Sequence, residues 1–445
     1  MCEKYVDKYF YDMEEKPIFS QVGSGRADQN QSPGTEDRDL STDTVKRIRN
    51  LVGFWVLGLC NNFAYVVMLS AAYDLLHVDY HKSEEQVVIH NESNVTRCNP
   101  ISTGAILLAD ILPSLFIKLI APFIVIKTHV RVLIAIILSS LSFIITSASV
   151  GNWMTFLGVI CAALSGGLGE VTFLSYSSFF EKDVISTWSS GTGGAGVFGA
   201  LSYAGLHFVL DTKYILLVML TIPVLTALVF WILIVHPVPV KCQCSSEMEP
   251  MLGDSIEMTK GNYSKPSELY SFRKKLSLVK PLLKYMIPLG LVYFAEYLIN
   301  QGLFELLYFP NAEKWLNQKE QYRWYQVDYQ IGVLISRSSV NFFQVKRLWI
   351  LPILQIINVI ILLLQIYFSF IPSIWIVLAL IFYEGLLGGC AYVNTFYRIS
   401  SEVAEEDKEF SMGVASLGDS VGIALAGAVS MPVHDRLCKF LWWSS

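Results

Sequence analysis

The sequence is poor in charged residues and in the motifs on which most enzymes depend. Charged residues fill only 16% of the 445 positions, whereas an average soluble protein carries about a quarter. The chain has seven histidines and contains no H-E-x-x-H, G-x-S-x-G or Walker-type sequence. No group of residues has the spacing of a metal site, and we expect no cofactor. These absences argue against an enzyme.

Further absences narrow the partners and the compartment. The segment 1–50 is polar and lacks the apolar core of a cleavable signal peptide, so we expect it to be a disordered cytosolic tail. No basic patch with interleaved aromatic residues points to nucleic acid. The eight cysteines show no disulfide framework. Cys242 and Cys244 are open to lipidation or remain unmodified.

Long apolar runs are abundant, since 53% of the residues are hydrophobic. Each run is long enough for the roughly 20 residues that an α-helix needs to cross a bilayer. The runs predict an all-α polytopic membrane protein with about eleven transmembrane helices. Their ranges are 51–75, 102–126, 131–150, 153–178, 187–210, 213–236, 281–309, 324–344, 347–370, 372–397 and 410–432.

A polar segment divides these runs into two groups. The segment 237–280 is the longest internal loop and is rich in Ser, Glu and Lys. We expect it to be a cytosolic linker between a six-helix bundle, 51–236, and a five-helix bundle, 281–432. This 6+5 arrangement resembles that of major-facilitator transporters. The remaining segment 433–445 is too short for another span and predicts a short amphipathic tail at the membrane surface.

Charge and glycosylation sequences predict the orientation. Lys and Arg concentrate in the loops that share one side with a cytosolic N-terminus, as the positive-inside rule requires. The sequons at Asn91 and Asn94 then fall in a lumenal loop, where they can be glycosylated. The sequon at Asn262 falls in the cytosolic linker, and we expect it to be unused.

Ionisable residues inside the runs are candidates for function, because each costs about 2.5–3.5 kcal/mol to place in a membrane. Glu170 and Glu384 lie in glycine clusters at corresponding places of the two halves, and Asp110 lies in the second run. These three carboxylates either link neighbouring helices by hydrogen bonds or exchange protons during transport. Lys284 and Asp419 lie near predicted span ends, where snorkelling explains them without a function.

Two further sets of residues predict a substrate site. Glu296, Asn300 and Gln301 concentrate polarity in one run, and the first two share a helical face. Lys118 and Arg337 are the cations best placed to bind an anionic substrate. The bidentate guanidinium of Arg337 suits a phosphate, although anchoring at the membrane surface explains this residue equally well.

The stretch GTGGAG at 191–196 matches the G-x-G-x-x-G pattern of a dinucleotide-binding loop, but no strand precedes it. Read as a helix, it places Gly191, Ala195 and Gly199 on one stripe and Gly196 on the adjacent stripe. Small residues at this spacing let transmembrane helices approach closely. We therefore predict helix packing here rather than nucleotide binding.

The predicted spans contain the stretches LLADILPSLFIKLIAP, SGGLGEVTFLS, WSSGTGGAG, VYFAEYLINQGLFELLYF and YEGLLGGCAYVNTF. These stretches resemble the battenin family of lysosomal and endosomal membrane glycoproteins, and the resemblance extends over nearly all spans. It implies a major-facilitator-like fold in the membrane of lysosomes and late endosomes. It also implies a role in clearing glycerophosphodiesters from the lysosome, and it makes Glu296 a position sensitive to substitution.

Outside the spans the sequence departs from the family. Members of the family carry an acidic dileucine sorting signal for trafficking adaptors in the central loop. The nearest string here contains Glu247, Met251 and Leu252, with Met in place of the first Leu. Mammalian members end in a prenylation box, whereas Cys438 lies too far from the end for the C-a-a-X form.

Two functional hypotheses follow from these observations. The first is a secondary transporter that exports small anionic glycerophosphodiesters from the lysosome by alternating access, with protons as a candidate coupling ion. The second is a non-transporting membrane scaffold that regulates trafficking and lysosomal homeostasis through its cytosolic loops.

Overall fold

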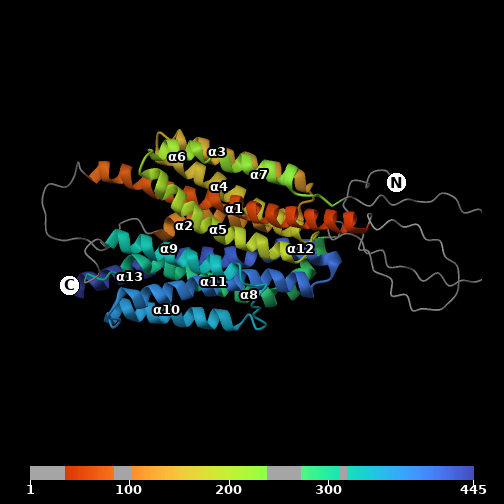
Figure 1. Ribbon diagram of the computed structural model, residues 1–445. Coiled ribbons are helices and arrows are strands. Elements are labelled where there is room, and N and C mark those ends of the chain that lie inside the picture. Colours follow the sequence, from red (N-terminus) through yellow and green to blue (C-terminus); the bar gives the residue numbers. More distant parts are fainter. Residues whose placement is uncertain (1–35, 85–102, 238–271, 311–317, 445) are drawn as a thin grey trace, which may run out of the picture.

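The computed structural model describes residues 36–84, 103–237, 272–310 and 318–444. All regular secondary structure within these ranges is helical (Figure 1). The helices of the first half of the chain lie along one side of the molecule. Those of the second half lie along the other side, with the long axes of the two groups roughly aligned. The predicted sites at Asn91, Asn94, Glu247, Met251 and Leu252 lie outside the described residues.

The first bundle contains five long helices and one interrupted crossing. The long helices are α1 (Glu36–Glu84), α2 (Thr103–Ile120), α3 (Thr128–Ser147), α4 (Asn152–Ser177) and α5 (Asp183–His207). The interrupted crossing consists of α6 (Thr212–Val218), α7 (Thr221–Leu228) and the π-helical turn η2 (Val229–Leu233). A 3-10 turn, η1 (Ala121–Phe123), extends α2 at its C-terminal end.

The second bundle begins after the linker. Its elements are α8 (Phe272–Gly302), the 3-10 turn η4 (Phe304–Leu306), α9 (Gln318–Arg337), α10 (Ile350–Phe368), α11 (Ile374–Glu402), α12 (Glu405–Ala415) and α13 (Leu417–Ser444). The short helix α12 and the long helix α13 together form the last crossing.

Eight helical segments of the described residues are long and apolar enough to cross a membrane. The predicted spans 102–126, 187–210 and 324–344 are not among these eight, and they correspond to α2, α5 and α9. α5 is rich in glycine, and α9 is on average a polar helix. Both lie where the two bundles meet and pack against each other (Figure 1). A helix covered by other helices does not need an apolar surface on every side.

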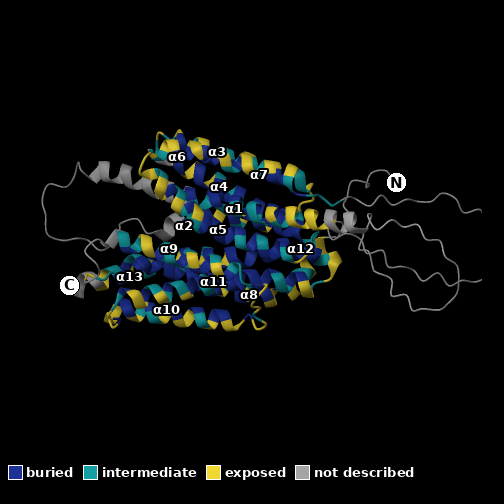
Figure 2. Cartoon of the chain, in the orientation of Figure 1, coloured by how far each residue is buried: buried dark blue, intermediate teal, exposed yellow. Residues whose placement is uncertain are grey.

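The lipid-facing surface is carried by the outermost helices. α3 and α10 lie at opposite edges of the molecule, and their outer faces are exposed (Figure 2). On α10 the exposed residues Ile353, Ile356, Ile357, Ile360 and Leu364 recur every three or four positions. This period places them on one face of the helix, as expected of a surface in contact with lipid chains.

The ends of the chain differ from the sequence predictions. α1 begins at Glu36, inside the range expected to be a disordered tail. α13 runs without a break to Ser444, so 433–444 continues the last helix instead of starting a separate segment. Cys438 on α13 is disulfide-bonded, which corrects the prediction that the cysteines form no such link. Sequence spacing alone does not reveal a pairing that depends on the tertiary fold.

Glycines bring the helices together at the crossings inside each bundle. A Cβ on Gly191 of α5 would lie 2.0 Å from the Trp55 carbonyl oxygen of α1, and one on Gly58 of α1 would lie 2.4 Å from the Trp188 oxygen. In the second bundle, a Cβ on Gly422 of α13 would lie 2.1 Å from the Gly290 oxygen of α8. Only glycine allows backbones to approach this closely.

The GTGGAG stretch lies in the middle of α5 and forms contacts on two sides. Gly191 and Gly199 face α1, where Gly199 packs against Val66. Gly193 and Gly196 face α9 of the other bundle, where Gly193 lies against the backbone of Leu334 and the stem of Arg337. Ala195 is fully buried. The stretch is therefore helical and packs against both bundles, with no strand and no phosphate loop.

Replacing Gly191 with Ala tests the α1–α5 crossing. The new Cβ would meet a backbone oxygen, which cannot move without shifting the helix, so we expect a loss of about 1–3 kcal/mol of stability. Thermal unfolding of the purified protein in detergent measures the effect. Gly205→Ala, on the same helix with nothing within 4 Å of its Cβ position, is the matched control and should not lower the unfolding temperature. Equal stability of the two variants would contradict the contact.

Candidate functional site

Buried charges gather at the seam between the bundles, where α2, α4 and α5 face α8, α9, α11 and α13. They fall into three groups. We name them the lysine cluster (Lys118, Glu170, Asp419 and Ser420), the arginine cluster (Arg337, Thr192, Tyr293 and Tyr392) and the carboxylate pair (Glu296 and Glu384).

The lysine cluster ties the two bundles together. Lys118 Nζ on α2 lies 2.6 Å from Glu170 Oε2 on α4 and 3.3 Å from Asp419 Oδ1 on α13. It also donates to Ser420 Oγ at 2.7 Å. Lys118 is 3% exposed, and its charge is already compensated by two carboxylates. Lys118 is predicted as a cation for an anionic substrate, and in this structure its ammonium is paired with Glu170 and Asp419.

Asp419 belongs to the lysine cluster, which its position in the sequence did not predict. Its place near a predicted span end suggested snorkelling, but α13 begins at Leu417 and directs Asp419 into the seam, where it is 4% exposed. A buried carboxylate requires a cation or hydrogen-bond donors. Lys118 supplies the charge, and the Ser420 backbone N–H donates to Asp419 Oδ1 at 2.6 Å.

The arginine cluster holds a cation among neutral groups. Arg337, near the end of α9, donates from Nη1 to Thr192 Oγ1 on α5 at 2.7 Å and from Nη2 to Tyr293 Oη on α8 at 2.8 Å. Its guanidinium lies 4.2 Å from the ring centroid of Tyr392 on α11. Within the described residues Arg337 forms no salt bridge, and its enclosed Nε has no hydrogen-bond partner. The guanidinium is thus placed in the seam rather than at a surface anchor.

Tyr392 connects the arginine cluster with the lysine cluster. Its hydroxyl donates to Glu170 Oε1 at 2.7 Å and accepts from Trp188 Nε1 at 3.3 Å, while its ring packs under Arg337. Tyr392 was not predicted from the sequence, because aromatic residues count as apolar in a membrane span. Its position, eight residues after Glu384 on the same helix, was the one available signal.

The carboxylate pair lies on the side of the second bundle. Glu296 on α8 is 2% exposed and accepts a hydrogen bond from the Tyr329 hydroxyl on α9. Glu384 on α11 is fully buried. Among the described residues neither oxygen of Glu384 has a hydrogen-bond partner, and neither does Glu296 Oε2.

The remaining predicted residues lie along the same helices. Asn300 is buried one turn after Glu296 on α8, and its Oδ1 has no hydrogen-bond partner in the described part of the chain. Gln301, next along α8, is half-buried. Asp110 on α2 is buried and interacts electrostatically with Lys118 two turns later. No group of three or more potential metal ligands occurs among the described residues.

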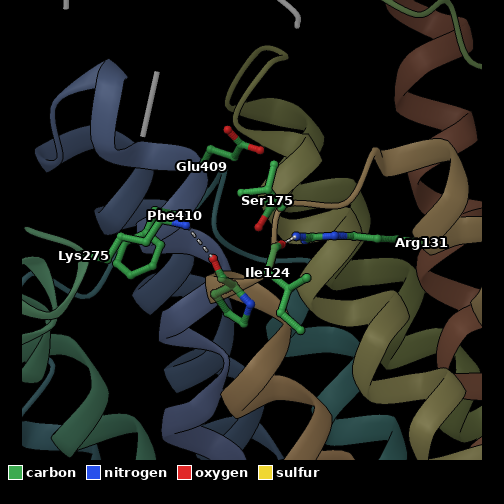
Figure 3. Close-up of a pocket in the computed structure, with 8 residues that line it drawn as sticks. Ile124, Arg131, Ser175, Lys275, Glu409 and Phe410 are labelled. Carbon is green, nitrogen blue, oxygen red and sulfur yellow. Dashed lines mark hydrogen bonds between the residues drawn. The ribbon is translucent and has the colours of Figure 1, made fainter. Parts of the chain in front are cut away.

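A second set of charged residues joins the bundles at the end where α1 and α8 begin. Here Lys275 of α8 donates to the Pro122 carbonyl of η1 at 3.3 Å (Figure 3). Arg131 of α3 donates to the Ala121 and Ile124 carbonyls at 3.0 and 2.6 Å. Glu409 of α12 interacts electrostatically with both cations. These contacts line a small pocket and hold this end of the seam together.

Comparison with known proteins identifies the family. The family model described as CLN3 protein matches residues 52–440. The chain is 46% identical to "Battenin" of Canis lupus familiaris over 408 residues, which cover 88% of this chain and 91% of the relative. The chain belongs to the CLN3 protein family. Another relative, "Protein BTN1" of Kluyveromyces lactis, is 37% identical, with 87% and 94% of the two chains covered.

Solved structures show which fold this CLN3 family member has. The human organic anion transporter MFSD10 (TETRAN) aligns with a TM-score of 0.55 at 13% identity, over 89% of this chain and 96% of that one. A bacterial homologue of the human lysosomal transporter Spinster aligns with a TM-score of 0.50 at 14% identity, over 87% and 82%. The predicted all-α, major-facilitator-like fold is thereby confirmed.

Replacing Lys118 with Met tests the lysine cluster. The change leaves Glu170 and Asp419 as unpaired buried charges, so we expect a loss of about 3–5 kcal/mol of stability. Thermal unfolding and the yield of monodisperse protein in detergent report it. Adding Glu170→Gln removes one orphaned charge and should recover part of the loss. A Lys118→Met protein as stable as the parent would show that the ion pairs contribute nothing.

Proposed function

We propose that this protein is a secondary transporter that exports glycerophosphodiesters from the lysosome to the cytosol by alternating access. The family resemblance supports the lysosomal location and this substrate class. The major-facilitator-like fold supports transport by rocking of two bundles about a central site. MFSD10, which shares the fold, is an organic anion transporter, and this agrees with an anionic substrate.

Arg337 is the observation that carries the proposal. It is a cation at the seam with only neutral hydrogen-bond partners among the described residues. Arginine binds phosphate oxygens through two parallel N–H donors, which makes it well suited to a phosphate group. A phosphodiester carries one negative charge at neutral pH, which matches a single uncompensated guanidinium. We propose that the phosphate displaces the Thr192 or Tyr293 hydroxyl from Arg337.

Polar groups on α8, about two turns beyond the Tyr293 that binds Arg337, are suited to the rest of the substrate. Asn300 has an enclosed amide oxygen without a partner in the described residues, and Gln301 follows it on α8. We propose that these amides bind glycerol or head-group hydroxyls. Lys118 is proposed to act as a structural tie through its ion pairs, and the phosphate is assigned to Arg337 alone.

Replacing Arg337 with Ala tests the substrate assignment. Loss of a charge-assisted hydrogen bond of about 1.5–3 kcal/mol should lower uptake of glycerophosphoglycerol by about tenfold or more. Uptake is measured in proteoliposomes that contain only this protein, and Arg337→Lys should retain part of it. Arg323→Ala on the same helix, where Arg323 is exposed and paired with Glu320, is the control and should transport normally.

The opposite pattern would favour the scaffold. In that case Arg337→Ala cells would clear glycerophosphodiesters normally, and deletion of 241–270, which includes the weak sorting signal for trafficking adaptors, would abolish clearance. The transporter predicts loss of clearance with Arg337→Ala even when the protein reaches the lysosome.

We also propose that the N-terminus is cytosolic and the C-terminal end of α13 lumenal. α1 begins at one end of the molecule and α13 finishes at the other (Figure 1). Cys438 near the end of α13 is disulfide-bonded, and disulfides persist in oxidising compartments rather than in the cytosol. This supports the orientation that the positive-inside rule predicts.

Glycosylation provides the test of orientation. With Asn91 and Asn94 in the lumen, the Asn91→Gln, Asn94→Gln double variant should lose the mobility shift that a glycosidase produces on gels. Asn262→Gln should leave the shift unchanged. Loss of the shift with Asn262→Gln would place the central linker in the lumen and reverse the topology.

A further inference from the structure

The carboxylate pair is the least compensated group in the seam. Glu384 is fully buried with no hydrogen-bond partner for either oxygen in the described residues. Glu296 uses one oxygen for Tyr329 and leaves the other without a partner. Glu170 differs, because Lys118 and Tyr392 both bind it. Burying an ionised carboxylate without partners is costly, so such a group takes up a proton instead.

The carboxylate of Glu296 on α8 lies against the face of α11 that carries Glu384. Gly388 lies one turn after Glu384 on the same face of α11. A Cβ on Gly388 would lie 2.2 Å from Glu296 Oε2, so the carboxylate end of Glu296 rests directly against this face. The charges of Glu296 and Glu384 interact electrostatically. Two neighbouring carboxylates in a buried site cannot both ionise without a large repulsion.

The groups that face Glu296 come from all the helices around it. They are Tyr329 and Arg337 on α9, Asp419 on α13, Glu384 on α11, and Tyr293 and Tyr297 on α8 itself. Arg337 is the one cation among them. Asp419 is already engaged by Lys118, and the tyrosines are neutral hydroxyls. The charge state of Glu296 therefore decides whether Arg337 is electrostatically compensated from within the protein.

We propose that the carboxylate pair is a proton site that controls anion binding at Arg337, so that one proton accompanies each phosphodiester. This inference rests on the proposed transport function. When Glu296 is ionised, its charge compensates Arg337 and repels the anion. When a proton from the acidic lumen neutralises the pair, Arg337 is free to bind the phosphate. Proton and monoanion together add no net charge to the buried seam.

The proposal gives export a direction. An acidic lumen loads the pair and the anion together, and the neutral cytosol takes the proton from Glu296. The returning negative charge then weakens the hold of Arg337 on the phosphate. The two carboxylates share one proton throughout, because both cannot ionise side by side in a buried site. The second proton, held on Glu296, is the one that is loaded from the lumen and released to the cytosol. Apart from the O–H bond of this proton, no covalent bond forms or breaks in the cycle.

Glutamine variants separate coupling from transport. We expect Glu296→Gln and Glu384→Gln to retain exchange of labelled glycerophosphoglycerol across proteoliposomes with substrate on both sides. Both should lose at least about tenfold of the accumulation that an imposed pH gradient drives, because glutamine neither takes up nor releases a proton. Glu305→Gln near the end of α8, whose carboxylate lies 3.5 Å from His434, is the control and should accumulate substrate as the parent does.

A measurement on the unmodified protein keeps the proposal testable if a variant fails to fold. A pH indicator in weakly buffered proteoliposomes should record proton movement with substrate, at about one proton per phosphodiester. If the unmodified protein exchanges substrate but a pH gradient drives no accumulation, or if both glutamine variants accumulate substrate under the gradient, the proton site is overturned and the transporter stands. Failure of the unmodified protein to exchange substrate at all would overturn both.

Discussion

The absence of water inside a bilayer is the constraint on which this structure depends, and the Lys118 ion pairs are its clearest result. A lysine in the membrane interior is tolerated only with a partner, and here the partners come from α4 of one bundle and α13 of the other. Because removing one member would strand buried charge, this cluster fixes how the bundles face each other. The contacts of Arg337 and Tyr392 across the same seam follow from that arrangement.

The two bundles use equivalent crossings but carry different chemistry at them. α1 crosses α5 through glycine contacts, and α8 crosses α13 in the same way. α2 packs on α4 at Ser114 and Gly167, while α9 packs on α11 at Gly332 and Gly385. Glu170 on α4 and Glu384 on α11 hold corresponding places. Lys118 compensates Glu170, whereas the place facing Glu384 holds another carboxylate. Glu170 is thus paired with a lysine, whereas Glu384 has no hydrogen-bond partner among the described residues.

The close crossings explain how the polar groups stay buried. Glycines on α5 and α11 let Arg337 and Glu296 approach the opposite helix backbone. These two side chains occupy the space that a larger residue at the glycine positions would fill. At the end where α8 begins, Lys275 and Arg131 bind the carbonyls around η1 and close the seam. In the proposed transport cycle, rocking of the bundles opens such contacts at one end while the other end closes, which requires interactions that water can replace.

The sequence by itself determined that this is a membrane protein and where its helices cross. It also showed that Glu296, Glu384 and Arg337 carry a free-energy cost of insertion into the membrane. Hydropathy and charge are local properties, so they can be evaluated along the chain without knowing its partners. Only the tertiary structure decided which charges are compensated. Lys118 and Asp419 lie 301 positions apart, and whether they meet depends on the rotation of α2 and α13 about their axes. The same applies to Tyr392, because its hydroxyl donates a hydrogen bond to Glu170 on the other bundle.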